Sequence, residues 1–505
     1  MTPEQAIMLC IVVPFVGALL VVVTGSLPDL RETMTLISAG ILFYLVAIIY
    51  PLVAAGGNPT INAIEMLPGL SITFTVEPLG MLFAGIASFL WIVTSVYSIG
   101  YMRGHHEVNQ TRFYAYFAIA IGSAVGMAFS GNLLTLFIFY EILTLSTFPL
   151  VTHHGTEEAK RAGRVYLGLL LGTSIAFLLF AIIWTWVITD SLDFVAGGLL
   201  AGKIHGPMVG VLLALYVFGI GKAALMPFHR WLPAAMVAPT PVSALLHAVA
   251  VVKAGVFAVV KVVVYVFGVD ALAREASAGW LLYVAAFTII VASVIALRSD
   301  NLKRRLAYST VSQLSYVVIA AAILAPISVV GATLHIAAHA FAKITLFFAA
   351  GSILVTSHKT LVSELDGLGR RMPWTMGAFF VGALSMVGVP PTAGFVSKWY
   401  ILQGALQADQ MTAVAVIVLS TLLNAGYFLP IVYAAFFREE RRPKPARKRS
   451  KAGADDGAHA PLLEHGEAPP TVVAPVVLTA AATVLFFLYP DVALGLARQV
   501  AGMSP

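Results

Sequence analysis

Long runs of apolar residues, separated by short polar segments, follow one another along the whole chain. A helix needs about 20 apolar residues to cross a hydrocarbon core of about 30 Å. The runs are continuously apolar and do not alternate, which excludes the strands of a membrane β-barrel. The pattern predicts an all-α polytopic membrane protein with about 14 transmembrane helices, at residues 6–24, 34–55, 77–99, 111–129, 132–152, 164–188, 207–226, 241–267, 279–297, 305–325, 328–355, 373–405, 411–437 and 472–489.

The first run has the position of a signal peptide but not its composition. Glu4 stands where a basic segment is expected, and no small-residue cleavage site follows. We therefore expect this run to be retained as the first span.

Composition agrees with a membrane protein. Of the 505 residues, 59% are hydrophobic and 11% are charged, whereas a soluble domain is about 25% charged. The single cysteine, Cys10, excludes a disulfide scaffold. The chain contains no CxxC and no GxGxxG segment, so we expect it to hold no cofactor and no redox centre of its own.

The lysines and arginines define the expected orientation. Of the 30, 22 fall in the loops that follow odd-numbered spans, three in the other loops and tails, and five inside spans. Basic loops remain in the cytoplasm, which predicts that both termini lie on the outer side of the membrane. Loop 438–471 is the most basic, and we predict that it is disordered. No aromatic residue interleaves its charges, so nucleic-acid binding is not expected.

Charged residues inside the spans are the main chemical signal. A charge at the bilayer centre costs roughly 2.5–3.5 kcal/mol on insertion scales, and such residues usually mark an ion or proton path. A static ion pair is the alternative, but one carboxylate cannot neutralise several lysines. Lys261 lies near a span end, where it could reach the interface, and is left out of the predicted path. Beyond the first two positions of each span, the charged residues inside spans are Glu141, Lys222, Lys253, Lys261, Lys343 and Lys398.

Histidines accompany these charges. His335, His339 and Lys343 follow one another at four-residue spacing, hence on one helical face. Because histidine titrates near neutral pH, the row is typical of a proton relay; structural hydrogen bonding and metal binding are the alternatives. No carboxylate or cysteine shares the span, so no metal site is predicted. His247 lies similarly on the span that carries Lys253, whereas the pair at 153–154 marks a solvated span end.

Two spans are interrupted by proline. Pro227 follows Lys222 closely, and Pro390 and Pro391 precede Lys398. Unwound backbone at membrane depth is tolerated where it lines protein or a water-filled cavity. The interruptions are five spans apart, and an odd number of spans places two successive units in opposite orientations, the arrangement of an inverted-repeat transporter. The predicted units are residues 1–105, the repeats 106–270 and 271–437, loop 438–471 and the C-terminal span unit 472–505.

Four segments carry a resemblance to a known superfamily. GKAALMPFHRWLPAAMVAPTPVSALLHAVAVVKAGVF, DNLKRRLAYSTVSQLSY, HIAAHAFAKITLFFAAGS and GVPPTAGFVSKWY, together with FYEILTLS, resemble the antiporter-like membrane subunits. That superfamily is shared by complex I, energy-converting hydrogenases and Mrp-type multi-subunit cation/proton antiporters. The resemblance covers roughly residues 75–435 and implies fourteen helices, with inverted repeats of helices 4–8 and 9–13 and breaks in helices 7 and 12.

The resemblance also implies residue roles. It matches Glu141 and Lys222 to a glutamate–lysine pair, and it assigns a proton relay to Lys253, His247, His335, His339, Lys343 and Lys398. The HAVAVVKAG and VPPTAGF stretches are most similar to the D-type subunits of Mrp antiporters. The resemblance thus implies a proton-translocating subunit of a complex in a bacterial inner (cytoplasmic) membrane, which works with other membrane subunits on H+ and Na+. A complex I-like oxidoreductase or an energy-converting hydrogenase is the alternative parent complex.

Overall fold

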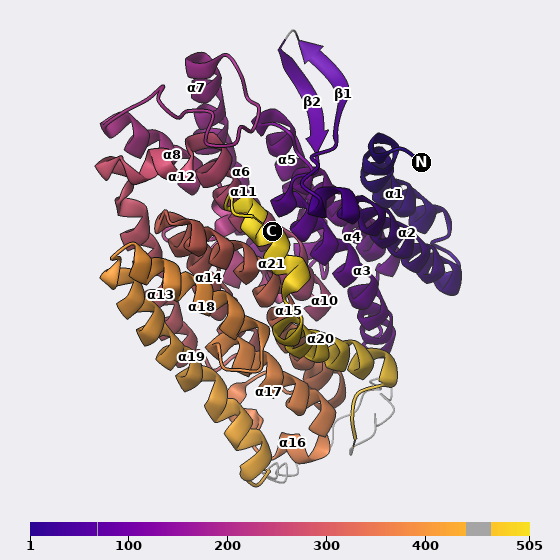
Figure 1. Cartoon of the computed structure of the whole chain (residues 1–505). Coiled ribbons are helices and arrows are strands. Elements are labelled where there is room, and N and C mark those ends of the chain that lie inside the picture. Colours follow the sequence, from indigo (N-terminus) through magenta and orange to yellow (C-terminus); the bar gives the residue numbers. More distant parts are fainter. Residues whose placement is uncertain (68, 441–465, 505) are drawn as a thin grey trace, which may run out of the picture.

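The computed structural model describes the chain except for residues 68, 441–465 and 505. Its helices run side by side in one bundle, and a two-stranded hairpin stands at one end (Figure 1). The first part of the bundle consists of α1 (Pro3–Val23), α2 (Pro28–Ala54), α3 (Pro78–Gly104), α4 (Gln110–Ala128), α5 (Leu133–Val151), α6 (Glu157–Thr173) and α7 (Leu179–Thr189), with the π-helical segment η1 (Ser174–Leu178) joining the last two.

The middle of the chain is divided into short helical segments. These are α8 (Pro207–Gly219), η2 (Gly221–Ala223), α9 (Trp231–Ala234), η3 (Ala235–Val237), α10 (Thr240–Ala244), η4 (Leu245–Val249), α11 (Val251–Lys261), η5 (Val262–Phe267), α12 (Val269–Ala273) and η6 (Ala276–Ala278). Segments η4 and η5 are π-helical, so α10 to η5 form one winding helix from Thr240 to Phe267.

The last part of the chain surrounds one central helix, α15. This helix packs against α3, α14, α17, α18 and α20. It is buried on nearly every side, which explains why its sequence is apolar apart from the face that carries His335, His339 and Lys343. The elements are α13 (Trp280–Arg298), α14 (Leu302–Ala322), α15 (Pro326–Ser357), η7 (Val362–Glu364), α16 (Leu368–Arg371), α17 (Pro373–Val387), α18 (Ala393–Gln407), α19 (Met411–Phe437), α20 (Pro470–Leu488) and α21 (Asp491–Val500).

The predicted fold class, an all-α polytopic membrane protein, is confirmed. In the described part of the chain, ten helices are long and apolar enough to cross a membrane, and α8 and α17 are shorter apolar helices. A broken helix consists of pieces that are each shorter than a full span. A count of long apolar helices therefore omits it. The total of fourteen spans therefore stays a prediction.

The hairpin is an element that the sequence analysis does not predict. Strands β1 (Thr60–Leu67) and β2 (Leu70–Thr75) pair antiparallel between α2 and α3. The Asn132 side-chain amide donates to the Ser71 carbonyl at 2.7 Å, and the Thr73 amide donates to the Thr135 hydroxyl at 3.0 Å. The hairpin is thereby attached to the N-terminus of α5.

The first predicted interruption is a long non-α segment. Helix α8 ends at Gly219, the short 3₁₀ turn η2 carries Lys222, and α-helix resumes only at Trp231. Helix α11 crosses this segment at very close range, because a Cβ atom on Gly255 would lie 2.3 Å from the carbonyl carbon of Lys222. Glycine at 255 therefore permits the contact between the broken helix and α11.

The second interruption separates α17 from α18. Helix α17 ends at Val387, Pro390 and Pro391 lie in the gap, and α18 begins at Ala393. Gly388 adopts a φ of +89°, and a Cβ atom there would lie 2.7 Å from the Lys398 side chain. The absence of a side chain at 388 lets Lys398 fold back over the break.

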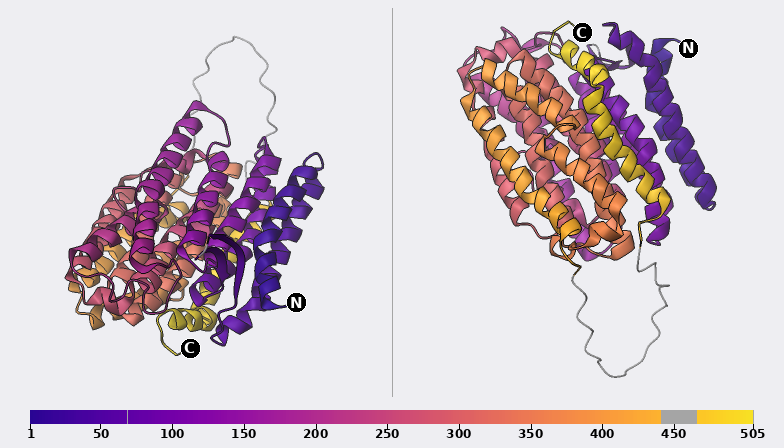
Figure 2. Two further views of the ribbon diagram at one scale, coloured as in Figure 1. Left: turned by 90° about the horizontal axis from the view of Figure 1, so that it is seen from above. Right: turned by 60° about the horizontal axis from the view of Figure 1, so that its bottom comes forward.

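The loops rich in basic residues meet at one end of the bundle, called here the arginine-rich end. The Arg31 guanidinium donates to the Gln110 carboxamide at 2.9 Å, and the Arg112 guanidinium donates to the His153 carbonyl at 2.7 Å. Both chain termini lie at the opposite end (Figure 2). This arrangement agrees with the alternation of basic loops along the sequence.

Most of the predicted basic loop 438–471 lies outside the described residues. Its described edges are attached to the bundle. Glu440 pairs with Lys359 at 3.1 Å and with Arg371 at 3.0 Å, and Glu467 accepts a hydrogen bond at 2.7 Å from the Thr375 hydroxyl near the start of α17. The edges thus differ from the predicted disorder, because carboxylates flanking the basic run find fixed partners.

Candidate functional site

All five lysines that the sequence places inside spans are buried. The exposed fraction is 7% for Lys398 and at most 1% for each of the others. Their ammonium groups are surrounded by carbonyl and hydroxyl oxygens and by aromatic rings, and carboxylates are scarce around them among the described residues. The five lysines are Lys222, Lys253, Lys261, Lys343 and Lys398.

Lys222, on the broken helix, reaches across to α5. Its ammonium donates to the Tyr140 carbonyl at 2.8 Å and to the Thr144 hydroxyl. It also lies 3.1 Å from the centroid of the Tyr140 ring, a cation–π contact. Neutral oxygens and a ring face therefore hold this ammonium.

Glu141 adjoins this site without touching the lysine. Among the described residues its two carboxylate oxygens have no hydrogen-bond partner, and no ion pair within 4.0 Å joins Glu141 to Lys222. The two groups are nonetheless electrostatic neighbours, with Ser174 of η1 close by. In this conformation the expected pair is a through-space interaction without direct contact.

Lys253 begins a connected row of titratable groups. Its ammonium contacts Nδ1 of His339 across the interface between α11 and α15. The rings of His339 and His335 lie nearly parallel, with centroids 6.2 Å apart. The structure therefore brings together three of the residues predicted for the relay.

Both ring nitrogens of His335 are engaged. Nδ1 lies 2.8 Å from the Ser397 hydroxyl on α18, and Nε2 lies 3.0 Å from the carboxamide oxygen of Gln313 on α14. Ser397 is the residue directly before Lys398. The row thus extends from α11 through α15 to the second broken helix.

Lys398 lies at the end of this row. Its ammonium donates to the carbonyls of Met386 and Val387, at 2.7 Å and 3.1 Å, where α17 stops. The Tyr316 ring lies 4.7 Å from the ammonium and stacks on His335. The carbonyls released by the helix break therefore stabilise the lysine.

Lys343 lies beside the row rather than within it. Its ammonium donates to the Ser309 hydroxyl at 2.9 Å, which also accepts from the Tyr427 hydroxyl at 3.2 Å. Lys343 interacts electrostatically with Lys253 and His339. It can thus change the proton affinity of the row without direct contact.

His247 lies in the π-helical segment η4, fully buried against the Phe347 ring. Neither ring nitrogen has a hydrogen-bond partner among the described residues. Its electrostatic neighbours include Lys253, Lys343 and Lys303. A buried imidazole with open nitrogens beside the start of the row is available to exchange a proton.

Several neutral residues of the site were missed by sequence reasoning. Hydroxyls and amides are common in membrane helices, so they carry no distinct signal until the fold places them beside a charge. Gln313, the lone amide in its apolar run, was the one detectable case. The residues missed are Tyr140, Thr144, Ser309, Gln313, Tyr316, Ser397 and Tyr427.

Lys261 does not reach the interface, as its span-end position suggested. It is fully buried, pairs with Glu77 at 3.3 Å and donates to the Ser130 carbonyl at 2.6 Å. Its ammonium also lies 4.1 Å from the centroid of the Phe194 ring. Glu77, itself 8% exposed, directly precedes α3 and lines a cavity of about 580 Å³.

No group of three histidine, cysteine, aspartate or glutamate side chains is placed to hold a metal ion in the described part of the chain. The contacts of His335 and His339 are with Ser397, Gln313 and Lys253. The histidine row therefore consists of hydrogen-bonding and ring contacts.

These features define a class of protein: polytopic membrane proteins in which a row of titratable side chains crosses the bundle between two broken helices. A profile of the family described as NADH:quinone oxidoreductase/Mrp antiporter, TM, matches residues 130–424, more than half of the chain. The chain belongs to this family.

Two curated relatives illustrate the two parts of this description. The chain is 34% identical to NADH-quinone oxidoreductase subunit N of Desulforudis audaxviator, over 79% of this chain and 81% of that protein. It is 31% identical to the A/B subunit of a probable K(+)/H(+) antiporter of Rhizobium meliloti, over 97% of this chain but only 50% of that protein.

Solved structures share the fold over nearly the whole length. A chain of the Mrp complex from Dietzia sp. DQ12-45-1b superposes with a TM-score of 0.84 at 24% identity, over 99% of this chain and 97% of that chain. A chain of the membrane-bound sulfane sulfur reductase, an archaeal respiratory membrane complex, gives a TM-score of 0.82 at 24% identity with the same coverage.

Proposed function

We propose that this protein is a proton-translocating, antiporter-like subunit of a multi-subunit complex in a bacterial inner membrane, of the Mrp monovalent cation/proton antiporter type. The observation that carries the proposal is the connected row Lys253–His339–His335–Ser397–Lys398, buried between two broken helices. Neutral side chains would pack these helices together at a lower free-energy cost than buried lysines and histidines. Packing alone therefore does not account for a row of exchangeable protons inside apolar helices.

Proton movement along the row follows from its contacts. A proton on Lys253 passes to His339 through their direct contact. The step to His335 crosses rings whose centroids are 6.2 Å apart, so one ring turns or one water molecule bridges them. The Ser397 hydroxyl then connects His335 to the chain position next to Lys398.

Glu141 controls the charge on Lys222 in this proposal. A carboxylate close to a buried lysine favours its protonated form, and one that moves away favours release. The two groups are neighbours without contact, and the carboxylate oxygens are free of other hydrogen bonds among the described residues. A change in their separation would therefore load or unload Lys222.

The orientation and the partners complete the proposal. The arginine-rich end faces the cytoplasm by the positive-inside rule, which leaves both termini outside. The similar solved chains come from multi-subunit membrane complexes, and we infer that this chain likewise functions beside other membrane subunits. The ions are H+ and, in an Mrp-type complex, Na+.

A complex I-like or hydrogenase-like complex is the second candidate. The relation to a quinone oxidoreductase subunit N over 81% of that protein favours it. The two candidates differ in the driving reaction. A pulse of Na+ or K+ releases protons from energised vesicles in the first case, whereas NADH or hydrogen oxidation is needed in the second.

The function is tested in everted vesicles from cells that co-express the chain with the products of its neighbouring genes. We expect Glu141→Gln and Lys222→Ala each to lower ion- or redox-driven proton flux by about 100-fold, since loss of a positioned proton-transfer group typically costs that much. Lys203→Ala, at an exposed lysine, is the matched control. Undiminished flux in both relay variants, at normal expression, would refute the proposal.

A further inference from the structure

Three histidines surround one carboxylate at the arginine-rich end. His105 Nδ1 and His154 Nε2 lie 3.3 Å and 3.4 Å from one oxygen of Glu107, and His153 Nε2 lies 3.8 Å from the other. Glu107 and His105 follow α3, whereas the other two histidines follow α5. Two loops far apart in sequence are thus joined around one acidic group. We call these four residues the histidine cluster.

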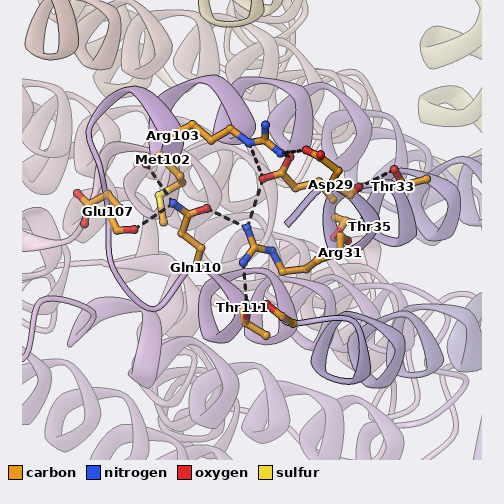
Figure 3. A network of polar contacts seen from close by, with 11 residues as sticks. Asp29, Arg31, Thr33, Thr35, Met102, Arg103, Glu107, Gln110 and Thr111 are labelled. Carbon is orange, nitrogen blue, oxygen red and sulfur yellow. Dashed lines mark hydrogen bonds and ion pairs between the residues drawn. The ribbon is translucent and has the colours of Figure 1, made fainter. Parts of the chain in front are cut away.

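Glu107 of the cluster borders a cavity of about 690 Å³ that Arg31, Arg103 and Gln110 also line. The rim of this cavity is fixed by a hydrogen-bond network (Figure 3). Gln110 accepts from the Arg31 guanidinium at 2.9 Å and donates to the Glu107 carbonyl at 3.0 Å. Arg103 donates to Glu32 at 2.6 Å. The rim is therefore a built structure rather than a loose loop.

A polar column leads from the cluster into the bundle. The His105 ring stacks on Tyr101, with centroids 5.7 Å apart and planes 9° from parallel. The Tyr101 hydroxyl accepts from the Thr240 hydroxyl at 3.4 Å, at the start of α10. Thr240 and Ser243 lie three residues apart on one face of α10, and His247 follows in the π-helical segment η4. Polar side chains therefore occur along the helix between the cluster and the imidazole of His247.

Lys303 forms a second connection. Its half-buried ammonium donates to the Ala238 carbonyl at 2.6 Å, just before α10. It interacts electrostatically with Glu107 on one side and with His247 on the other. A cation in this place couples the charge of the cluster to that of the buried imidazole.

We propose that the histidine cluster is the portal through which protons pass between the water at the arginine-rich end and the buried relay. Glu107 attracts protons, His105 and His154 exchange them with solvent, and the Tyr101–Thr240 column conducts them to His247. The inference rests on the proposed function and assigns its proton-exchange site on this face.

Electrostatics support this assignment. Burial opposes ionisation of Glu107, but the contacts from His105 and His154 outweigh it and lower the pKa of this carboxyl to about 2. The contact with Glu107 raises the pKa of His105, whereas burial lowers the pKa of His153. A permanent anion therefore faces imidazoles of graded proton affinity. The other charged or titratable groups that face the cluster are Tyr101, Arg112 and Lys303.

The test measures proton flux in everted vesicles with the whole complex, while the pH of the external medium is varied. With Glu107→Gln we expect flux to fall about tenfold at about pH 8 and to approach that of the unmodified protein at about pH 6, because bulk protons then replace captured ones. Added imidazole should restore flux at the higher pH. Glu275→Gln is the matched control, since Glu275 also pairs with a histidine, His205 at 3.1 Å, away from the cluster; it should leave the pH profile unchanged.

Three outcomes would overturn the portal. Flux unchanged by Glu107→Gln, with Lys222→Ala inactive, rejects the portal and leaves the proposed function standing. A loss that is equal at every pH and resists imidazole assigns a purely structural role to the cluster. Full flux in Lys222→Ala rejects the relay and the portal together. If Glu107→Gln fails to assemble, His154→Gln, at a partly exposed residue, is subject to the same criteria.

Discussion

The ammonium of Lys261 lies within ion-pair distance of a carboxylate. Among the described residues, the other four lysines inside spans have no such partner. Glu77 lies 3.3 Å away, and both side chains are almost completely buried. A buried pair costs desolvation energy for both charges, and removal of one partner leaves the other uncompensated. Lys398, by contrast, is held by two carbonyls and tolerates the loss of its charge without leaving an unpaired anion. We therefore assign Lys261 to the stability of the fold, whereas the surroundings of Lys398 are compatible with the proton exchange proposed above.

This difference predicts a stability effect. Glu77→Gln should lower the free energy of unfolding by about 3–5 kcal/mol, because Lys261 is then left charged and unpaired. The measurement is thermal or denaturant-induced unfolding of the purified protein in detergent.

A double variant provides the control. Glu77→Gln combined with Lys261→Met should recover most of the lost stability, since no buried charge remains. Glu65→Gln, at an exposed glutamate of the hairpin, should change stability little. If the loss of unfolding free energy in the double variant equals the sum of the losses in the two single variants, the two side chains do not interact.

The site residues that could be predicted from the sequence are those whose type is unusual for their own segment, whatever their neighbours in space. A lysine within an apolar run is visible without knowledge of its neighbours, so Lys222, Lys253 and Lys343 were found. Glu77 and Glu107 stand at a span boundary and in a loop, where charges are ordinary. Their importance depends on tertiary contacts with Lys261 and the histidines, which no local pattern contains.

The contact between α11 and the turn η2 determines where Lys222 lies. A Cβ atom at position 255 would come within 2.3 Å of both the Ala223 nitrogen and the Lys222 carbonyl carbon. Backbone atoms cannot turn aside as a side chain can, so the two segments would have to separate. The position of the relay lysine thus depends on a residue with no side chain.

Gly255→Ala is therefore expected to destabilise the protein by about 1–3 kcal/mol, the typical cost of overpacking, and to reduce proton flux by displacing Lys222. Unfolding in detergent and vesicle flux are both measured. Gly377→Ala in α17 is the control, because a Cβ atom there meets nothing within 4 Å. Equal behaviour of the two variants would contradict the close contact.

At the scale of elements, proline predicts the interruptions but not their extent. Pro227 lies within a non-α segment that extends from Ile220 to Arg230, because the turn at Lys222 begins well before the proline. The π-helical segments carry no such signal, since they arise where an extra residue is accommodated against neighbouring helices. The hairpin was missed for a related reason: its strands are short and lie between two spans whose apolar runs dominate the pattern.

For the whole molecule, the arrangement of the two ends makes the orientation testable. Cys10 is fully buried, so a cysteine introduced elsewhere gives the labelling signal. Met503→Cys, 38% exposed near the C-terminus, should react with a membrane-impermeant maleimide only from outside. Val108→Cys, 63% exposed at the arginine-rich end, should react only from inside. Reaction of both from the same side would contradict the proposed topology.

The depth of the buried lysines has an electrical consequence. Lys253 lies midway along the helix from Thr240 to Phe267, and Lys398 folds back to the break between α17 and α18. In the proposed relay, a proton that passes between groups at equal depth does almost no work against the transmembrane voltage, whereas movement across the whole bilayer costs about 2.3 kcal/mol per charge per 100 mV. The voltage therefore acts on the passage between the surface and His247. In this proposal the membrane voltage controls how the row is filled and emptied rather than how protons move within it.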